Sequence, residues 1–497
     1  MRFDRQSGVF MHVTSLPGPH GIGDLGQGAR DFVDFLARAD QSLWQFCPLG
    51  PTSDAMANSP YQAFSAFAGN PLLVSLSELE ERGLLEAEDL EPVPDFDRHA
   101  TDYERVEAYK TPLLQTAFER FDDESHDAGD HDAFEAFREA EAYWLDGYAL
   151  FMALKSEFDG ALWTEWPREL KTREASALEE YRERLAEDVR YHEFVQFVFD
   201  RQWSALAEYA HDNGVGLVGD LPIYVALDSA DVWSAPEAFL LDEENEPTAV
   251  AGVPPNPGDD GQRWGNPLYD WDHLQATDYG WWMDRLRRLF DLVDITRLDH
   301  FKGFDEFWAI PADADDPAAG EWRDAPGYDF FETAQAEFGD LPFIAEDLGF
   351  IDQGLIDFRE EFDLPGMKVP HYADWCRAGD PNQPMHYPEN AVAYSATHDT
   401  DTTVGFYNSM SDEQRDCLHY NLGTDGGDIH WDMIDAVWNS NAVLALAPMQ
   451  DLLGLDSHAR FNTPGTEEGN WEWRVTREGF DGDVADHLAM LTDMSIR

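Results

Sequence analysis

The sequence predicts an α/β fold, a (β/α)₈ TIM barrel with inserted, mainly helical subdomains. Eight short apolar runs recur along the chain, and most end at proline, glycine or a polar residue. Helical patterns such as 29–39 and 281–293 lie between several runs, and alternating strands and helices are typical of a parallel sheet. Polar residues follow the runs, where a barrel carries its reactive groups. The eight runs are Val9 to Val13, Leu43 to Leu49, Val215 to Val218, Leu292 to Ile295, Phe343 to Ala345, Met367 to Val369, Val392 to Tyr394, and Leu444 to Ala447.

The gap between the second and third runs is far too long for a single crossover helix. Residues 77–212 are acidic and strongly helical in pattern, with apolar residues at helical spacing. We therefore expect an inserted helical subdomain at approximately residues 60–212.

A second insertion follows the third run, at approximately residues 235–275. It is rich in proline, glycine and asparagine and contains AGVPPNPGDDGQRWGNPLYDWD. This composition predicts a long ordered loop over the active face. The whole chain, residues 1–497, is then one catalytic barrel with two insertions.

The composition is strongly acidic. The chain has 100 acidic and 33 basic residues, a formal charge of -67, and 43% hydrophobic residues. Lysine is scarce, and acidic residues are spread over nearly every segment, which indicates a halophilic protein, since their repulsion is screened within a few Å at about 1 M salt. The apolar content argues against disorder, and nucleic acid is a poor partner for such a surface. The lysines are Lys110, Lys155, Lys171, Lys302 and Lys368.

The three cysteines, Cys47, Cys376 and Cys417, lack metal-ligand spacing, and their odd number favours reduced thiols. No segment approaches the roughly 20 apolar residues of a membrane span, and the N-terminus has no signal-peptide pattern. We expect a cytoplasmic protein with no membrane association. The sequence leaves the oligomeric state open.

The fourth run leads directly into a group of charged residues. Arg297 and Asp299 are two positions apart, so both side chains leave the same face of a strand. A permanent cation beside Asp299 favours the ionised carboxylate that a displacement at a sugar carbon requires. Taken by itself, the motif favours a structural ion pair at a strand end over a nucleophile.

Three carboxylates, Asp299, Glu346 and Asp399, follow separate runs, and neighbouring strand ends can bring them around one bond. Retaining glycosidic chemistry needs one ionised nucleophile and one protonated acid, and a third carboxylate can hold sugar hydroxyls. A metal site at His398, Asp399 and Asp401 is disfavoured because one loop does not complete a coordination shell. The segment GIGDLG matches a dinucleotide-binding pattern but begins too far after its strand.

The sequence resembles the amylomaltases, the 4-α-glucanotransferases of glycoside hydrolase family seventy-seven, almost from end to end. The motifs that carry the resemblance are HVTSLPGPHGIGDLG, SPYQAFSAFAGNP, GDLPIYVALDSADVW, GQRWGNPLYDW, TRLDHFKGF, AEDLG, THDTDT, PMQDLLGL, RFNTPG and GNWEWR.

The resemblance implies a barrel of the α-amylase superfamily without a separate terminal β-sandwich domain. It makes Asp299 the nucleophile, Glu346 the general acid/base and Asp399 the transition-state stabiliser. Glu346 must first be protonated, so its surroundings are expected to be drier than those of Asp299. The residues expected to bind substrate are Arg297, His398, Asp220, Tyr61 and Trp264.

The expected activity is transfer of an α-1,4-glucan segment from a maltooligosaccharide, starch or glycogen-type donor to glucose or another maltooligosaccharide. Neither a cofactor nor a catalytic metal is implied. Two alternatives stay open, an α-1,4-glucan hydrolase on the same barrel and a non-catalytic glucan-binding protein.

One loop departs from the family pattern. Where many members carry an aromatic residue after VPP, this chain has NPGDD, Asn256 to Asp260. The substitution puts acceptor retention, cycloamylose formation and the ratio of transfer to hydrolysis in doubt.

Overall fold

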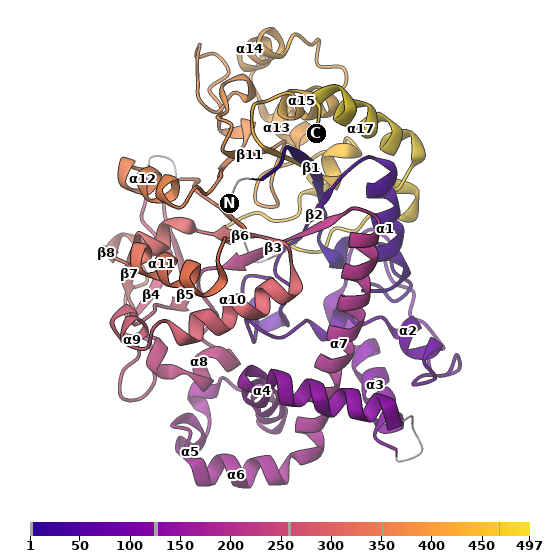
Figure 1. Cartoon of the computed structure of the whole chain (residues 1–497), viewed down its shortest axis with the longest axis vertical. Helices are drawn as coiled ribbons and strands as arrows, with labels where there is room; N and C mark the ends of the chain where they lie inside the picture. The colour runs from indigo at the N-terminus through magenta and orange to yellow at the C-terminus, as the bar shows by residue number, and fades with distance from the viewer. Residues whose placement is uncertain (1–2, 124–127, 257–259, 350, 467) are drawn as a thin grey trace.

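The computed structural model describes residues 3–123, 128–256, 260–349, 351–466 and 468–497. Within these ranges, eight parallel strands close into a barrel in the order β1-β12-β11-β10-β9-β6-β3-β2 (Figure 1). The predicted barrel is confirmed. Its strands are β1 (Gln6–Phe10), β2 (Leu43–Gln45), β3 (Gly216–Pro222), β6 (Ile295–Asp299), β9 (Phe343–Ala345), β10 (Gly366–Lys368), β11 (Ala391–Tyr394) and β12 (Leu444–Pro448).

Each predicted run overlaps one barrel strand, but several boundaries differ, two of them for a clear structural reason. The first strand ends at Phe10 because residues 13–15 form a 3-10 helix. The fourth begins only at Ile295 because helix α10 (Gly280–Leu292) continues to Leu292. Arg297 and Asp299 therefore belong to strand β6 itself rather than to the loop after it.

The barrel interior is filled by alternate residues of its strands. In β12, Leu444 and Leu446 contact Val218, Ile344 and other inward side chains, while Ala445 and Ala447 pack in the layer toward the helices. This two-residue alternation fixes which side chains of each strand face the barrel axis.

Helices cover the outside of the barrel. In α1, Ala29, Phe32, Val33 and Leu36 recur at helical spacing and are fully buried, so this face packs on the barrel. The helices after β1 and after β6 to β12 are α1 (Gln27–Arg38), α11 (Gly327–Phe338), α12 (Gln353–Glu361), α13 (Thr403–Ser409), α14 (Asp412–Leu422), α15 (Ile429–Trp438), α16 (Met449–Leu452) and α17 (Gly482–Ser495).

The long segment between β2 and β3 is helical, as its pattern indicates. Its last helix, α7, contacts β3, and α4 packs along α7 (Figure 1). The limits of this unit as a subdomain stay a prediction. Its helices are α2 (Leu76–Glu81), α3 (Tyr103–Phe121), α4 (Ala128–Glu157), α5 (Arg168–Lys171), α6 (Ala175–Arg184) and α7 (Ala186–Asp212).

The second insertion differs from the expected loop. Between the short helices α8 (Ala230–Ser234) and α9 (Trp271–Ala276) it contains two strands, β4 (Ala249–Val253) and β5 (Gln262–Pro267). They form an antiparallel sheet, in the order β5-β4-β7-β8, with β7 (Glu306–Pro311) and β8 (Glu321–Asp324). The paired residues of β4 and β7 lie 56 to 62 positions apart, from Gly252–Trp308 to Ala249–Pro311, so local composition gave no sign of the pairing.

Cys376 and Cys417 are joined by a disulfide that ties the segment after β10 to α14. The expectation of reduced thiols is wrong for these two residues, because the fold brings together cysteines that are 41 positions apart. Cys47 is free and buried. No helix in the described part of the chain is both long and apolar enough to cross a membrane.

Candidate active site

A cleft of about 490 Å³ lies among segments that follow the carboxyl ends of the barrel strands. Six of the eight predicted site residues line it, and the other two, Asp220 and His398, lie immediately behind its surface. The closed barrel thus brings together side chains that are up to 338 positions apart, from Tyr61 to Asp399. The six lining residues are Tyr61, Trp264, Arg297, Asp299, Glu346 and Asp399.

Strand β6 places a cation between two carboxylates. Ile295 faces the barrel interior, so Arg297 and Asp299 face it too. The Arg297 guanidinium contacts Asp220 Oδ2 at 2.7 Å and Asp299 Oδ1 at 2.8 Å. Burial alone would lower the pKa of Arg297, but Asp220 and Asp299 raise it well above its usual value. Asp299 therefore has a permanently charged partner at ion-pair distance.

Glu346 has different surroundings. It follows β9, in which Ile344 faces inward, and its carboxyl group accepts hydrogen bonds from the backbone N–H groups of His300 and Leu348, both at 2.8 Å. The pKa of Glu346 is raised to about 7, mainly by burial, with Arg297 opposing the shift and Asp299 adding to it. A substantial fraction of Glu346 is protonated near neutral pH, as a general acid requires.

His300 reaches Glu346 through an unusual backbone conformation. Its φ of 51° lies in the left-handed region, which is uncommon for a residue other than glycine. This conformation follows the end of β6 and presents the His300 N–H to the Glu346 carboxylate. The imidazole ring contacts Trp264 edge to face, with 4.9 Å between the ring centroids. Residues 300 and 264 thus form one wall of the cleft.

Asp399 is held on both carboxylate oxygens. His398 Nε2 lies 3.1 Å from Oδ2, and the Asn462 side-chain amide donates to Oδ1 at 2.6 Å. Burial would raise the pKa of Asp399, but His398 and Asn462 hold it well below its usual value. The pKa of His398 is raised, because Asp399 outweighs the effect of burial. Asp399 is therefore ionised at neutral pH.

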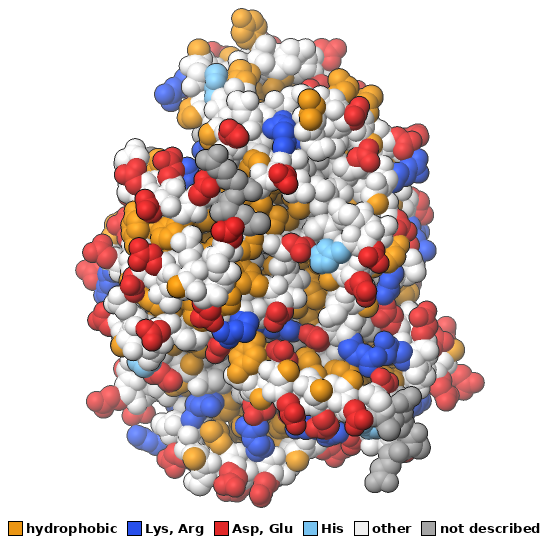
Figure 2. All heavy atoms as spheres, in the orientation of Figure 1, with side chains coloured by type: hydrophobic (Ala, Val, Ile, Leu, Met, Phe, Trp, Pro, Cys, Tyr) orange, Lys and Arg blue, Asp and Glu red, His pale blue; other side chains and the backbone are white. Residues whose placement is uncertain are grey.

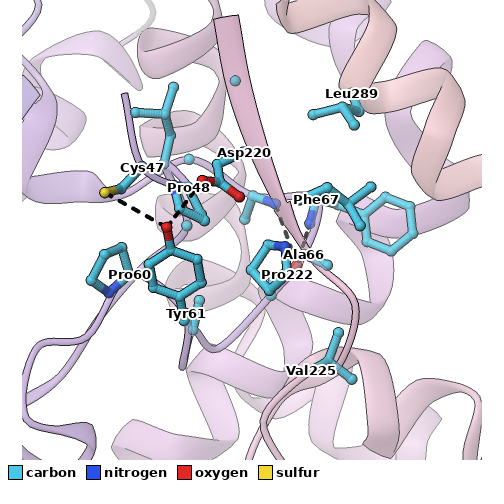
Figure 3. A pocket seen from close by; sticks show the side chains of 18 of the residues that line it. Cys47, Pro48, Pro60, Tyr61, Ala66, Phe67, Asp220, Pro222, Val225 and Leu289 are labelled. Atoms are coloured by element: carbon cyan, nitrogen blue, oxygen red, sulfur yellow. Dashed lines mark hydrogen bonds between the residues drawn. The ribbon is translucent and has the colours of Figure 1, made fainter. Parts of the chain in front are cut away.

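Tyr61 connects the two halves of the site. Its hydroxyl donates to Asp220 Oδ2 at 3.0 Å (Figure 3). The same hydroxyl lies 2.9 Å from His398 Nε2, and the Tyr61 ring stacks on the His398 ring with 5.3 Å between the centroids. Burial raises the pKa of Asp220 to about 6, against the opposing effect of Arg297. A continuous set of polar contacts consequently runs from Asp299 to Asp399: Arg297, Asp220, Tyr61 and His398 are its intermediate members.

A small, mainly apolar cavity of about 80 Å³ lies behind Tyr61, with Cys47 and Asp220 on one side and Phe67 and Leu289 on the other (Figure 3). Burial raises the pKa of the Cys47 thiol well above its usual value. The thiol is therefore neutral, and this excludes Cys47 as a nucleophile at neutral pH.

Several lining residues were missed by sequence reasoning. Tyr372 follows β10, one of the runs with no acidic ending, and its side chain is half exposed in the cleft. Asn462 lies in RFNTPG, a motif that carried the family resemblance but no predicted role. Trp471 lies in GNWEWR and packs on Tyr61. Only the motifs could have signalled the last two, because neither residue is near a strand end in sequence.

No group of three or more His, Cys, Asp or Glu among the described residues is arranged to hold a metal ion.

A parallel barrel that gathers an ion-paired carboxylate, a carboxyl group with a pKa near 7 and a third carboxylate at one end defines a class of barrel enzymes, those that act on glycosidic bonds. A family model described as 4-alpha-glucanotransferase matches residues 11–478. The chain belongs to this 4-alpha-glucanotransferase family, and the protein is an enzyme of that type.

Close relatives cover the whole chain. The 4-alpha-glucanotransferase of Synechocystis is 45% identical over 495 residues, 99% of this chain and 97% of the relative. That of Thermus thermophilus is 45% identical over 96% of this chain and 95% of its own. Among solved structures, the amylomaltase of Streptococcus agalactiae in complex with acarbose is 37% identical, with a TM-score of 0.95 over 99% of both chains.

Proposed function

We propose that this enzyme transfers an α-1,4-glucan segment to the 4-hydroxyl of glucose or a maltooligosaccharide by a retaining double displacement. One observation carries the proposal: the same cleft holds Asp299 beside the Arg297 cation and Glu346 with a pKa of about 7. A nucleophile held beside a permanent cation and a carboxyl group that can be protonated near neutral pH are what retaining glycosidic chemistry needs.

In the first step, Asp299 attacks the anomeric carbon of the donor while Glu346 protonates the departing glycosidic oxygen. The glycosidic bond breaks, the Asp299 ester to the sugar forms, and the reducing-end fragment leaves with the proton of Glu346. Asp399, held ionised by His398 and Asn462, stabilises the positive charge that develops on the sugar ring.

In the second step, the ionised Glu346 takes the proton of the acceptor 4-hydroxyl, whose oxygen displaces Asp299 from the anomeric carbon. A new α-1,4 bond forms, and both carboxyl groups return to their starting states. Water can replace the acceptor, so transfer depends on holding a sugar in the acceptor site. Tyr61, Trp264 and Tyr372 supply aromatic surface in the cleft for this purpose.

Asp220 and His398 are proposed to support sugar binding from behind the cleft surface. The Asp220 side chain is fully buried against Arg297, and His398 is 4% exposed. Both hold the Tyr61 hydroxyl, so they fix the ring that faces the substrate. Their direct contact with a sugar hydroxyl stays a prediction.

The proposed donors are maltooligosaccharides, starch and glycogen-type glucans, because the family acts on α-1,4-glucans and the related amylomaltase binds acarbose. A halophilic source is proposed from the charge of -67. The cytoplasmic location stays a prediction, and the Cys376–Cys417 disulfide removes the support that the cysteines gave it. In the segment Asn256 to Asp260, which departs from the family pattern, residues 257–259 lie outside the described ranges.

Incubation with maltotriose in molar KCl tests the proposed function. We expect glucose and a ladder of longer maltooligosaccharides with little gain in total reducing ends. Rising reducing ends, with glucose and maltose accumulating, would instead identify the hydrolase. Tight glucan binding without turnover would identify a binding protein. The Asp299→Asn variant is the control for contaminating activity.

A further inference from the structure

The segment Arg460–Asn462, from the RFNTPG motif, lies against the loop that carries Asp399. It follows the short 3-10 helix Ser457–Ala459, and the Asn462 backbone N–H donates to the His398 carbonyl at 3.0 Å. Phe461 is 3% exposed and packs against Phe10 and Trp471. The buried aromatic ring fixes the segment in place beside Asp399.

Both side chains that flank Phe461 bind Asp399. The Asn462 amide donates to Oδ1 at 2.6 Å, which leaves Oδ2 to His398. The Arg460 guanidinium donates from Nη2 to the Asp399 carbonyl at 2.7 Å and from Nε to the Asn462 carbonyl at 2.8 Å. Arg460 therefore joins the backbones of two loops that lie 61 residues apart in the sequence.

The two contacts restrict different motions. The backbone bond from Arg460 fixes where the Asp399 Cα lies, and the amide bond from Asn462 fixes the rotation of its carboxylate. The Asn462 amide is neutral, so its hydrogen bond favours the ionised form of Asp399 without placing a second charge beside the sugar. The other groups that face Asp399 are His398 on its own loop, Arg297 on β6, and the neutral Tyr372 and Cys47 side chains.

We propose that Asn462 and Arg460 are positioning residues that hold Asp399 in the orientation and ionisation state needed to stabilise the transition state. The inference rests on the proposed function, since it takes Asp399 to be the stabilising carboxylate. It extends that function to a segment whose residues had no predicted role.

The test compares the variants Asn462→Ala, Asn462→Asp and Arg460→Lys with the wild type. Disproportionation of maltotriose is measured in molar KCl as a function of pH, and circular dichroism checks the fold. Asn408→Asp on α13, whose exposed side chain is absent from the cleft lining, adds the same single charge and is the matched control.

For Asn462→Ala we expect kcat to fall by about 10- to 100-fold, the loss typical of a hydrogen bond to a charged group, with KM changing much less. Arg460→Lys should also lower kcat, because a lysine ammonium group cannot donate to the Asp399 and Asn462 carbonyls from the fixed positions that a guanidinium offers.

Asn462→Asp should shift the pH profile. Two carboxylates at hydrogen-bond distance share a proton, so the acid limb of kcat/KM should move upward by more than one pH unit. Asn408→Asp should leave this limb in place.

The outcomes separate this inference from the proposed function. Absence of transfer in the wild type would refute the function, whatever the variants do. Wild-type transfer together with near-normal kcat and an unmoved acid limb in the folded Asn462 variants would overturn the positioning role. If an Asn462 variant does not fold, the change of kcat relative to KM in Arg460→Lys decides the question.

Discussion

Asp299 and Glu346 are partly buried carboxyl groups of one cleft, yet they have different neighbours. Asp299 lies 2.8 Å from a guanidinium that also holds Asp220, whereas Glu346 accepts from two backbone N–H groups and carries a raised pKa. Burial is the main cause of the raised pKa of Glu346, and the hydrogen bond from the Leu348 N–H opposes it, whereas Asp299 is paired with a cation. At the scale of the residue, the assignment of nucleophile and acid therefore depends on both burial and partners.

Asp299→Asn and Glu346→Gln should each lower turnover of maltotriose by at least about 10³-fold, because each removes a group that forms or breaks a bond. The fold should stay intact, since both replacements keep size and shape. Glu361→Gln, at the exposed end of α12, removes a carboxylate outside the cleft and should leave turnover unchanged. Near-normal rates in either active-site variant would overturn the two roles.

The raised pKa of Glu346 predicts that the pH profile of kcat/KM has a basic limb. General-acid catalysis needs the protonated form, so kcat/KM for transfer should decline as the pH rises through about 7. A pH profile of wild-type kcat/KM in molar KCl checks this value. A rate that stays flat up to pH 9 would contradict it.

The same pKa has a consequence for stability. The folded state binds the Glu346 proton more tightly than the unfolded state, so stability is lost as the pH rises from the unfolded value of about 4.3 through about 7. Glu346→Gln removes that loss, on the order of 1–3 kcal/mol. Its thermal midpoint should exceed that of the wild type at pH 8.5 and match it at pH 4.5. Equal midpoints at both pH values would argue against the raised pKa.

Single elements differ in how far their own sequence determines them. The barrel strands are short apolar runs bounded by breakers, and α1 has a complete apolar stripe, so both were predictable. Strand β4 is an apolar segment, AVAGV, whereas β5 is mostly polar, and β4 pairs with β5 on one side and with β7 on the other. The sequence could not show this, since strand formation of that kind depends on the partner.

The disulfide is a second element-scale feature with a measurable effect. It closes a segment of 41 residues between Cys376 and α14, for which loop-closure entropy gives a stabilisation of up to about 4 kcal/mol. We expect dithiothreitol to lower the thermal midpoint of the wild type. The double variant Cys376→Ser, Cys417→Ser should start from that lower midpoint and not respond to dithiothreitol. A wild type that is insensitive to the reductant would contradict a stabilising bond.

At the scale of the whole molecule, charge dominates. Even if every lysine and arginine neutralised one carboxylate, 67 of the 100 acidic residues would remain uncompensated. Figure 2 shows Asp and Glu side chains scattered over the visible face rather than collected in one patch. Their repulsion acts against the compact state over the full surface, and salt weakens it by screening.

Dialysis to low salt should therefore unfold the protein. We expect loss of the native circular dichroism as KCl falls from about 2 M to below about 0.1 M, where the screening length grows from a few Å to about 10 Å. Sucrose at matched osmolality controls for water activity and should not replace the salt. A spectrum that is indifferent to salt would refute the halophilic interpretation.

The sequence by itself determined the barrel, its eight strand positions and the family, because apolar runs, breakers and long motifs are local features that need no partner. It also placed the three carboxylates at strand ends. Only the tertiary structure decided what surrounds them. Its contacts join residues that are tens to hundreds of positions apart in the sequence. Tyr61 links Asp220 to His398, a backbone N–H group donates to Glu346, and Asn462 and Arg460 hold Asp399. Protonation states depend on such contacts through burial and distance, and these quantities exist only once the chain has closed into the barrel.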